Sequence, residues 1–149
     1  MHELYDLGYQ EHGGFHLLES AIKEIRAVLV DIRFSPRARN PQYNQSFLVK
    51  TFGSRYIHLK EFGNKNYTGG PIEFVDFDKG VIELLNLLEF KPCILMCGCW
   101  NRRTCHRYTI AHWLEEKKGI PSIPFTPALA TEIVNANAPK QLDLFGKET

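Results

Sequence analysis

The chain has 149 residues, of which 44% are hydrophobic and 23% are charged. These values are typical of one globular domain with an ordinary core, and they exclude a disordered or fibrous chain. The formal net charge of +1 excludes a protein that coats nucleic acid through bulk charge alone.

Strands and helices are predicted to alternate along most of the chain. Apolar runs and alternation indicate strands at residues 4–9, 27–32, 56–59, 93–97 and 123–125. Helical spacing of apolar residues indicates helices at residues 15–26, 42–52, 76–90 and 104–118. This order predicts an α/β domain with a mostly parallel sheet covered by helices. We place this single domain at residues 1–134 and a flexible, mobile tail at residues 135–149.

Two chemically rich segments follow predicted buried strands, where ligands of α/β sheets bind. The first runs from Asp31 to Asn44. Its candidate phosphate-binding side chains are Arg33, Arg37, Arg39 and Asn44. Arginine binds phosphate through two parallel hydrogen bonds. Asp31 is a candidate catalytic base or an orienting partner for Arg33, and Phe34 and Tyr43 are candidates for stacking on a nucleobase.

The second segment runs from Cys97 to Arg107 and leads from a strand into a helix. Thr104 is the expected N-cap of that helix, so the next three residues would lie in its first turn, which attracts anions. The candidate phosphate-binding residues here are Arg103, Cys105 and Arg107, and the candidate catalytic residues are Cys97 and His106.

Three interpretations of the cysteines remain open. Cys97 and Arg103 have the Cys-x5-Arg spacing of cysteine phosphatases and rhodaneses, which predicts covalent catalysis by Cys97. Zinc ligation by Cys97, Cys99, Cys105 and His106 is a second interpretation, but Cys-x-Cys is a short spacing and the Cys105–His106 adjacency is awkward for one ion. In the third, Cys97 and Cys105 are buried apolar side chains beside an anion site. We expect free thiols, no metal and no cofactor.

The two segments together resemble a known family. The pattern Asp-x-Arg-x-x-Pro-x-x-Arg-Asn-Pro-x-Tyr-Asn begins at Asp31, Tyr-x-His-Leu-x-Glu-x-Gly begins at Tyr56, and Cys97 is followed by the triplet Cys105-His106-Arg107. This combination is similar to the domain of unknown function 488 family over about residues 4–125. The resemblance implies an α/β fold and a site at these strand ends.

The tail contains a second motif, Gln141-Leu142-Asp143-Leu144-Phe145. It resembles the bacterial sliding-clamp-binding motif, Gln-Leu-Ser/Asp-Leu-Phe, at all five positions. In such peptides the Gln hydrogen-bonds at one end of a groove and the apolar side chains fill a pocket. The resemblance implies that residues 141–145 bind the DNA polymerase sliding clamp.

The preferred hypothesis is a bacterial or phage DNA-metabolism protein for repair or processing. Its Arg/Cys/His crevice would bind nucleic acid or a nucleotide, and its tail would recruit it to the clamp. Alternatives are a cysteine-dependent enzyme for phosphate esters or sulfur transfer and a non-catalytic nucleic-acid adaptor. The polar N-terminus and the absence of an apolar run of about 20 residues lead us to expect no membrane partner. We expect a cytoplasmic, nucleoid-associated location; the sequence leaves open whether the protein is an enzyme.

Overall fold

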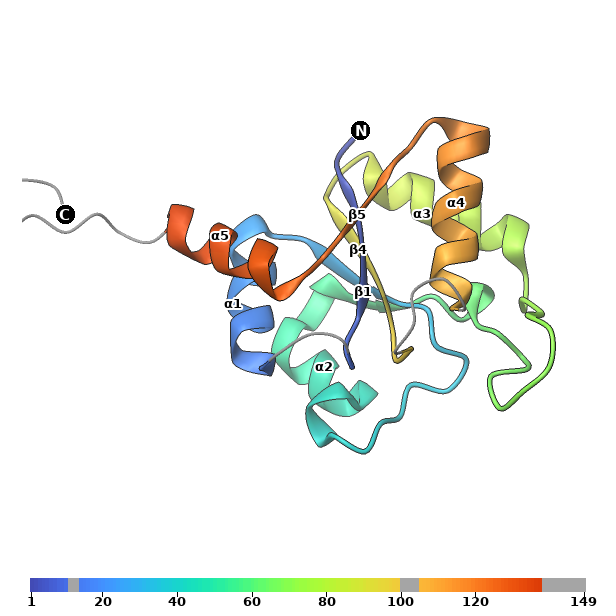
Figure 1. Ribbon diagram of the computed structural model, residues 1–149, viewed down its shortest axis with the longest axis horizontal. Helices are drawn as coiled ribbons and strands as arrows, with labels where there is room; N and C mark the ends of the chain where they lie inside the picture. Colours follow the sequence, from blue (N-terminus) through green and yellow to red (C-terminus); the bar gives the residue numbers. More distant parts are fainter. Residues whose placement is uncertain (11–13, 100–104, 138–149) are drawn as a thin grey trace, which may run out of the picture.

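A five-stranded parallel sheet forms the centre of the computed structural model, which describes residues 1–10, 14–99 and 105–137 (Figure 1). The strand order is β3-β2-β4-β1-β5, and every neighbouring pair is parallel. The strands are β1 (Leu4–Gly8), β2 (Val28–Asp31), β3 (Tyr56–His58), β4 (Cys93–Cys97) and β5 (Ser122–Pro124). The predicted parallel α/β domain is therefore confirmed.

Helices cover both faces of this sheet (Figure 1). The helices of the described ranges are α1 (Phe15–Ile25), α2 (Gln45–Phe52), α3 (Phe77–Leu88), α4 (His106–Lys118) and α5 (Pro127–Asn137). One face packs against α3 and α4, and the other packs against α1, α2 and α5. The result is a three-layer sandwich in which the strands are buried on both sides.

Strand β2 illustrates how the sequence produces these layers. Alternate side chains of a strand point to opposite faces. Val28 and Val30 pack in the layer with α3 and α4, whereas Leu29 packs with α1 and α2. All three are buried, and each such burial stabilises the fold by about 1.5–3 kcal/mol.

Three elements differ from the sequence prediction. Helix α4 begins at His106 with Cys105 at its N-cap, so the predicted start at residue 104 is wrong. The predicted helix at residues 42–52 is a short 3-10 turn (Pro41–Tyr43) followed by α2, because Asn44 between them is extended and its side chain accepts a hydrogen bond from Ala38 N.

Helix α5 was not predicted and continues to Asn137, so it includes the first residues of the expected tail. Thr126 Oγ1 accepts a hydrogen bond from Leu129 N at the start of this helix, at 3.1 Å. The helix packs along α1. Helix α5 therefore depends on a partner that is distant in sequence. The motif at residues 141–145 lies outside the described residues.

The connections place a crevice between β2 and β4. The helices that follow β1 and β2 pack on one face of the sheet, and the helices that follow β3 and β4 pack on the other. Strands β2 and β4 are neighbours, so from their carboxyl ends the chain continues to opposite faces of the sheet. Open α/β sheets bind ligands at such points.

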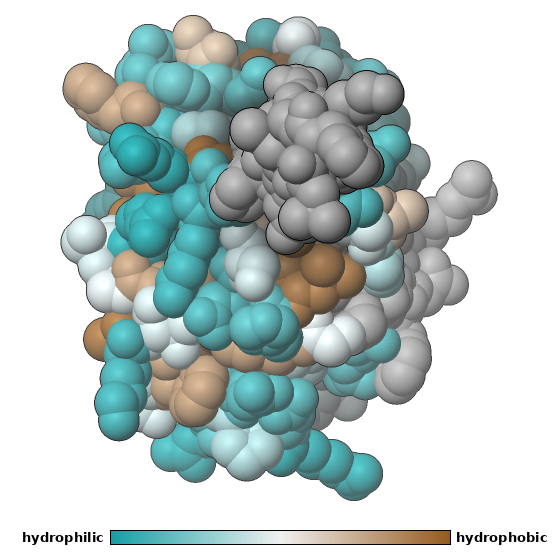
Figure 2. Space-filling model, turned by 90° about the vertical axis from the view of Figure 1, so that its left-hand side faces the viewer, coloured by the Kyte–Doolittle hydropathy of each residue, from teal (hydrophilic) through white to brown (hydrophobic). Residues whose placement is uncertain are grey.

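The surface is mainly hydrophilic on the side of the molecule that faces the viewer in Figure 2. Hydrophobic residues there form small areas between hydrophilic ones, as expected where amphipathic helices turn their polar faces outward. Within the described ranges, no helix combines the length and apolar character that crossing a membrane requires.

Candidate functional site

A cavity of about 810 Å³ lies at the carboxyl ends of β2 and β4. Five of the residues predicted to form the site line it: Arg33, Arg37, Cys97, Cys105 and His106. The two segments singled out in the sequence therefore meet in one cavity. The loop that follows β3 completes the wall with residues 64, 66–70 and 72.

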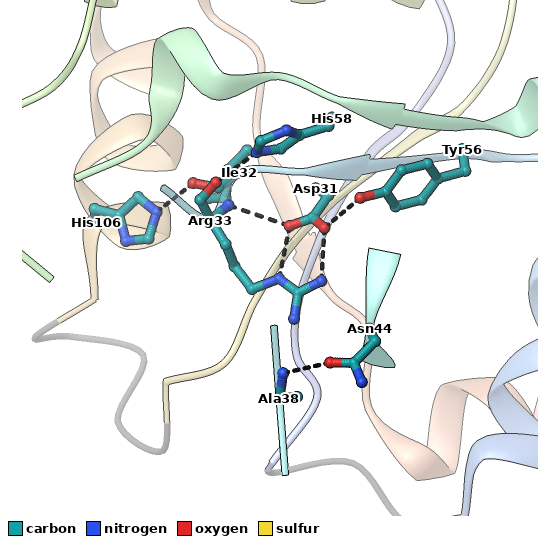
Figure 3. Close-up of polar contacts among 8 residues, drawn as sticks. All are labelled: Asp31, Ile32, Arg33, Ala38, Asn44, Tyr56, His58 and His106. Atoms are coloured by element: carbon teal, nitrogen blue, oxygen red, sulfur yellow. Dashed lines mark hydrogen bonds and ion pairs between the residues drawn. The ribbon is translucent and has the colours of Figure 1, made fainter. Parts of the chain in front are cut away.

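Asp31, the last residue of β2, holds Arg33 through two parallel hydrogen bonds (Figure 3). Arg33 Nε lies 2.8 Å from Oδ1 and Nη2 lies 2.7 Å from Oδ2. Tyr56 donates its hydroxyl to Oδ2 at 2.6 Å. The carboxylate is fully buried, so it orients Arg33, one of the two roles predicted for it, and ties β2 to β3.

The Arg33 guanidinium remains incompletely paired despite this contact. Arg33 is 7% exposed, and its buried Nη1 has no hydrogen-bond partner among the described residues. The guanidinium carbon lies 5.5 Å from the centre of the Tyr9 ring. Burial lowers the pKa of Arg33, but the hydrogen bonds and charge of Asp31 outweigh it, and the net shift is upward. Arg33 is therefore a permanent cation, and its side chain lines the cavity.

Tyr56 and His58 on β3 support the same corner. Burial and the charge of Asp31 raise the pKa of Tyr56, so its hydroxyl stays a donor. His58 Nε2 lies 2.7 Å from Arg33 O, and the carbonyl can only accept. These bonds fix the backbone where it leaves β2. Sequence reasoning did not identify Tyr56 as the partner of Asp31.

His106 connects the start of α4 to β2. Its Nε2 lies 2.8 Å from Ile32 O, so Nε2 carries the proton and donates it to the carbonyl. Burial lowers the pKa of His106, although the bond to Ile32 opposes this shift. The ring is neutral at neutral pH as a result, and Nδ1 is left as an acceptor 3.6 Å from Cys105 Sγ.

Three cysteines form a sulfur cluster in the cavity wall. The sulfurs of Cys97, Cys99 and Cys105 all lie within 4.8 Å of one another. Cys99 and Cys105 are joined as a disulfide, so the expectation that all four cysteines are free thiols is wrong for this pair. Cys97 Sγ lies 2.8 Å from Cys105 Sγ. The short connection from β4 to α4 brings these residues together.

Cys97 is fully buried at the end of β4. Burial raises the pKa of its thiol, and the neighbouring Arg107 opposes the shift. A thiol in this state is mainly protonated at neutral pH, which is unfavourable for the predicted role as nucleophile. Arg103, its predicted partner in a Cys-x5-Arg loop, lies outside the described residues.

Arg107 has partners inside the fold. Its Nε donates to Asp6 Oδ1 at 3.1 Å, its Nη1 donates to Cys97 Sγ at 3.3 Å, and it is 1% exposed. A Cβ on Gly8 would collide with Arg107 Nη1, so this arrangement needs glycine there. The residue predicted to bind phosphate thus joins α4 to β1. The sequence signal for this ion pair was the carboxylate of Asp6, which lies in an otherwise apolar predicted strand.

The remaining predicted phosphate ligands lie along the loop after β2. Arg37 and Arg39 are exposed. Arg37 lines both the cavity and an adjoining hollow of about 710 Å³. Asn44 also lines the hollow, whereas Arg39 lines neither. Sequence reasoning did not name Lys60, which lines the hollow and lies 4.9 Å from the centre of the Phe34 ring.

One of the comparisons with known proteins bears on this region. No curated protein and no solved structure gives a significant match to the chain. A family model matches residues 16–73, a range that contains β2, the segment from Asp31 to Asn44 and β3. The model is that of the family Domain of unknown function DUF488. This match supports the family resemblance drawn from the motifs.

Proposed function

We propose that the protein binds a phosphate-bearing nucleic acid or nucleotide in the cavity beside β2 and β4. The observation that carries this proposal is the charge of the wall. Among the described residues, the cavity is lined by two arginines and by no carboxylate. Such a wall attracts anions, and arginine suits phosphate in particular.

The adjoining hollow favours a polymer over a single nucleotide. It shares Phe34, Ser35, Arg37 and Tyr67 with the cavity. It adds Lys60 and, in the described part of the chain, no acidic residue. An extended anionic ligand can therefore continue from one hollow into the next past the same basic side chains.

An aromatic pair lies at the junction of the two hollows. The rings of Phe34 and Tyr67 are stacked with their centres 5.7 Å apart, and Tyr67 is 60% exposed. Aromatic side chains beside basic ones are typical of surfaces that bind single strands, because bases stack on the rings. We therefore expect a single strand to be preferred over a duplex.

Fluorescence anisotropy with a labelled single-stranded oligonucleotide at several salt concentrations tests this proposal. Affinity should fall as salt rises. Arg37→Ala should weaken binding by about tenfold or more, because a charge-assisted hydrogen bond contributes about 1.5–3 kcal/mol. Lys117→Ala is the matched control, since it removes one exposed positive charge at the far end of α4. Equal losses in both variants, or salt-independent binding, would contradict the proposal.

We further propose that residues 141–145 recruit the protein to a bacterial sliding clamp, which would make it a DNA-metabolism protein for repair or processing. The support is the match of Gln141-Leu142-Asp143-Leu144-Phe145 to the clamp-binding motif. A peptide of residues 138–149 should bind the clamp in calorimetry. Replacing Leu144 and Phe145 by Ala should weaken binding by at least about thirtyfold, because buried apolar anchors contribute about 2 kcal/mol or more.

The matched control for the peptide is Lys147→Ala, which changes a residue outside the motif. It should leave the affinity for the clamp nearly unchanged. An unchanged affinity in the Leu144/Phe145 double variant would exclude the motif as the contact, whatever the oligonucleotide experiment shows.

A further inference from the structure

The sulfur cluster of Cys97, Cys99 and Cys105 has a fourth potential metal ligand beside it. His106 Nδ1 lies 3.6 Å from Cys105 Sγ. Cys97 and Cys105 are buried, Cys99 is partly buried and His106 is 8% exposed. Three sulfurs and one imidazole nitrogen are a ligand set of structural zinc sites.

One distance in the cluster already fits a tetrahedral ion, and the sulfurs would have to move apart to bind one. Zinc bonds of about 2.3 Å to sulfur and about 2.05 Å to nitrogen place the two ligand atoms about 3.6 Å apart, which matches the separation of Cys105 Sγ and His106 Nδ1. Two sulfurs on the same ion lie about 3.8 Å apart, so Cys97 and Cys105 Sγ, now 2.8 Å apart, would separate by about 1 Å. The adjacency of Cys105 and His106 is therefore no obstacle.

The second nitrogen of His106 supports the same interpretation. Histidine ligands usually donate their other ring N–H to a carbonyl or carboxylate, which fixes the ring and the tautomer. Nε2 of His106 makes this bond to Ile32 O at 2.8 Å. The acceptor belongs to the residue directly after β2, 74 positions earlier in the chain, so the ring is held by the fold and not by the local turn.

The surroundings of Cys97 also suit a metal-bound thiolate. Arg107 Nη1 donates to Cys97 Sγ at 3.3 Å, and such N–H groups stabilise negative charge on sulfur. We propose that, when the Cys99–Cys105 disulfide is reduced, Cys97, Cys99, Cys105 and His106 bind a thiolate-preferring divalent cation such as Zn²⁺. The closed site would fasten the end of β4 to the start of α4 in the cavity wall.

Reduction and metal binding are separate, balanced steps. A dithiol reductant becomes a disulfide and delivers two electrons and two protons to the sulfurs of Cys99 and Cys105. The cation then displaces the thiol protons of Cys97, Cys99 and Cys105 into solvent. Disulfide formation and metal binding therefore exclude each other at this cluster.

Cobalt titration of the full chain tests the site, because thiolate-bound Co²⁺ has charge-transfer absorption and tetrahedral Co²⁺ has strong visible bands. The reduced wild-type protein should bind one Co²⁺ per chain, and Zn²⁺ should displace it. Cys99→Ser should lower the affinity at least about tenfold and the charge-transfer absorption by about one third, since two of three sulfurs remain. His106→Gln should weaken the tetrahedral bands.

Two controls keep the test independent of folding defects. Cys93→Ala removes a buried free cysteine outside the cluster and should bind Co²⁺ as the wild type does. The wild-type protein with its disulfide intact should not bind Co²⁺ tightly. Absence of charge-transfer absorption in reduced wild-type protein would overturn the site, as would equal spectra in Cys99→Ser, His106→Gln and wild type. The cobalt titration does not measure oligonucleotide binding. Its result therefore tests the metal site separately from the proposed nucleic-acid binding.

Discussion

Two residues that contact the Tyr9 ring each carry a buried polar group. Within the described part of the chain, Arg33 Nη1 and the Tyr43 hydroxyl have no hydrogen-bond partner. The Tyr43 ring stacks on Tyr9 with centres 4.3 Å apart, and Arg33 lies over the same ring. A buried polar group without a partner costs about 1–3 kcal/mol. Arg33 lines the cavity, whereas Tyr43 lines neither of the two hollows described above.

Tyr43→Phe should stabilise the fold by about 1 kcal/mol, because it removes a buried hydroxyl that has no partner. Burial raises the pKa of Tyr43 to about 12, against about 10 in the unfolded chain. The unfolded state thus loses its proton first, and wild-type stability should fall as pH rises from about 10 through 12. Urea denaturation at pH 7 and above pH 10 should show that the advantage of Tyr43→Phe grows with pH.

The control for this comparison is Tyr67→Phe, which removes the hydroxyl of an exposed tyrosine. It should change the free energy of unfolding by less than about 0.5 kcal/mol. A destabilised Tyr43→Phe variant would mean that the Tyr43 hydroxyl has a stabilising partner in solution.

Helix α3 shows how one glycine sets the distance between two elements. Gly80 lies in α3 and is buried. A Cβ at this position would lie 2.7 Å from Cδ1 of Phe62, and Phe62 is fully buried in the 3-10 turn Lys60–Phe62. The close approach of helix and ring therefore requires a residue without a side chain.

Gly80→Ala should destabilise the protein, although alanine is the better helix former. The helix propensity gain is about 1 kcal/mol, and the steric conflict with Phe62 costs about 1–3 kcal/mol. Asn86→Ala on the exposed side of α3 should instead stabilise by several tenths of a kcal/mol. Chemical denaturation of both variants checks the sign, and a stabilised Gly80→Ala would show that the Phe62 ring moves aside at little cost.

The molecule as a whole combines a cavity at the carboxyl ends of β2 and β4 with a separate sequence motif at residues 141–145. The family match covers residues 16–73 and does not extend to residues 141–145. The cavity wall draws on the loop after β2, the end of β4, the loop after β3 and the start of α4. The two proposed activities therefore depend on different parts of the chain and should be separable.

Deletion of residues 138–149 should abolish clamp binding and leave oligonucleotide affinity within about twofold. The described cavity residues remain in the shortened chain, and changes at sites that share no partners have independent effects. Arg37→Ala in the full chain should show the opposite pattern. Calorimetry with the clamp and anisotropy with the oligonucleotide, performed on both variants, measure this separation. A deletion that also weakens oligonucleotide binding tenfold would show that the two activities are coupled.

Local sequence was sufficient to predict most of the sheet and helices. The apolar runs at residues 27–32 and 93–97 correspond to β2 and β4, because a strand buried on both faces needs apolar residues throughout. Helix α5 was missed because its stability depends on packing against α1. The interruption at Asn44 was missed because it depends on a hydrogen bond to Ala38.

The position of the cavity was predictable as well, since two polar segments follow neighbouring parallel strands. Spacing could not assign the roles of the side chains. His106 and Arg107 are adjacent in sequence, yet His106 lines the cavity while Arg107 is buried against Asp6, 101 positions away. Helix geometry turns consecutive side chains by about 100°. Which direction meets the cavity and which meets a carboxylate depends on how α4 packs against the sheet, and no local pattern encodes that packing.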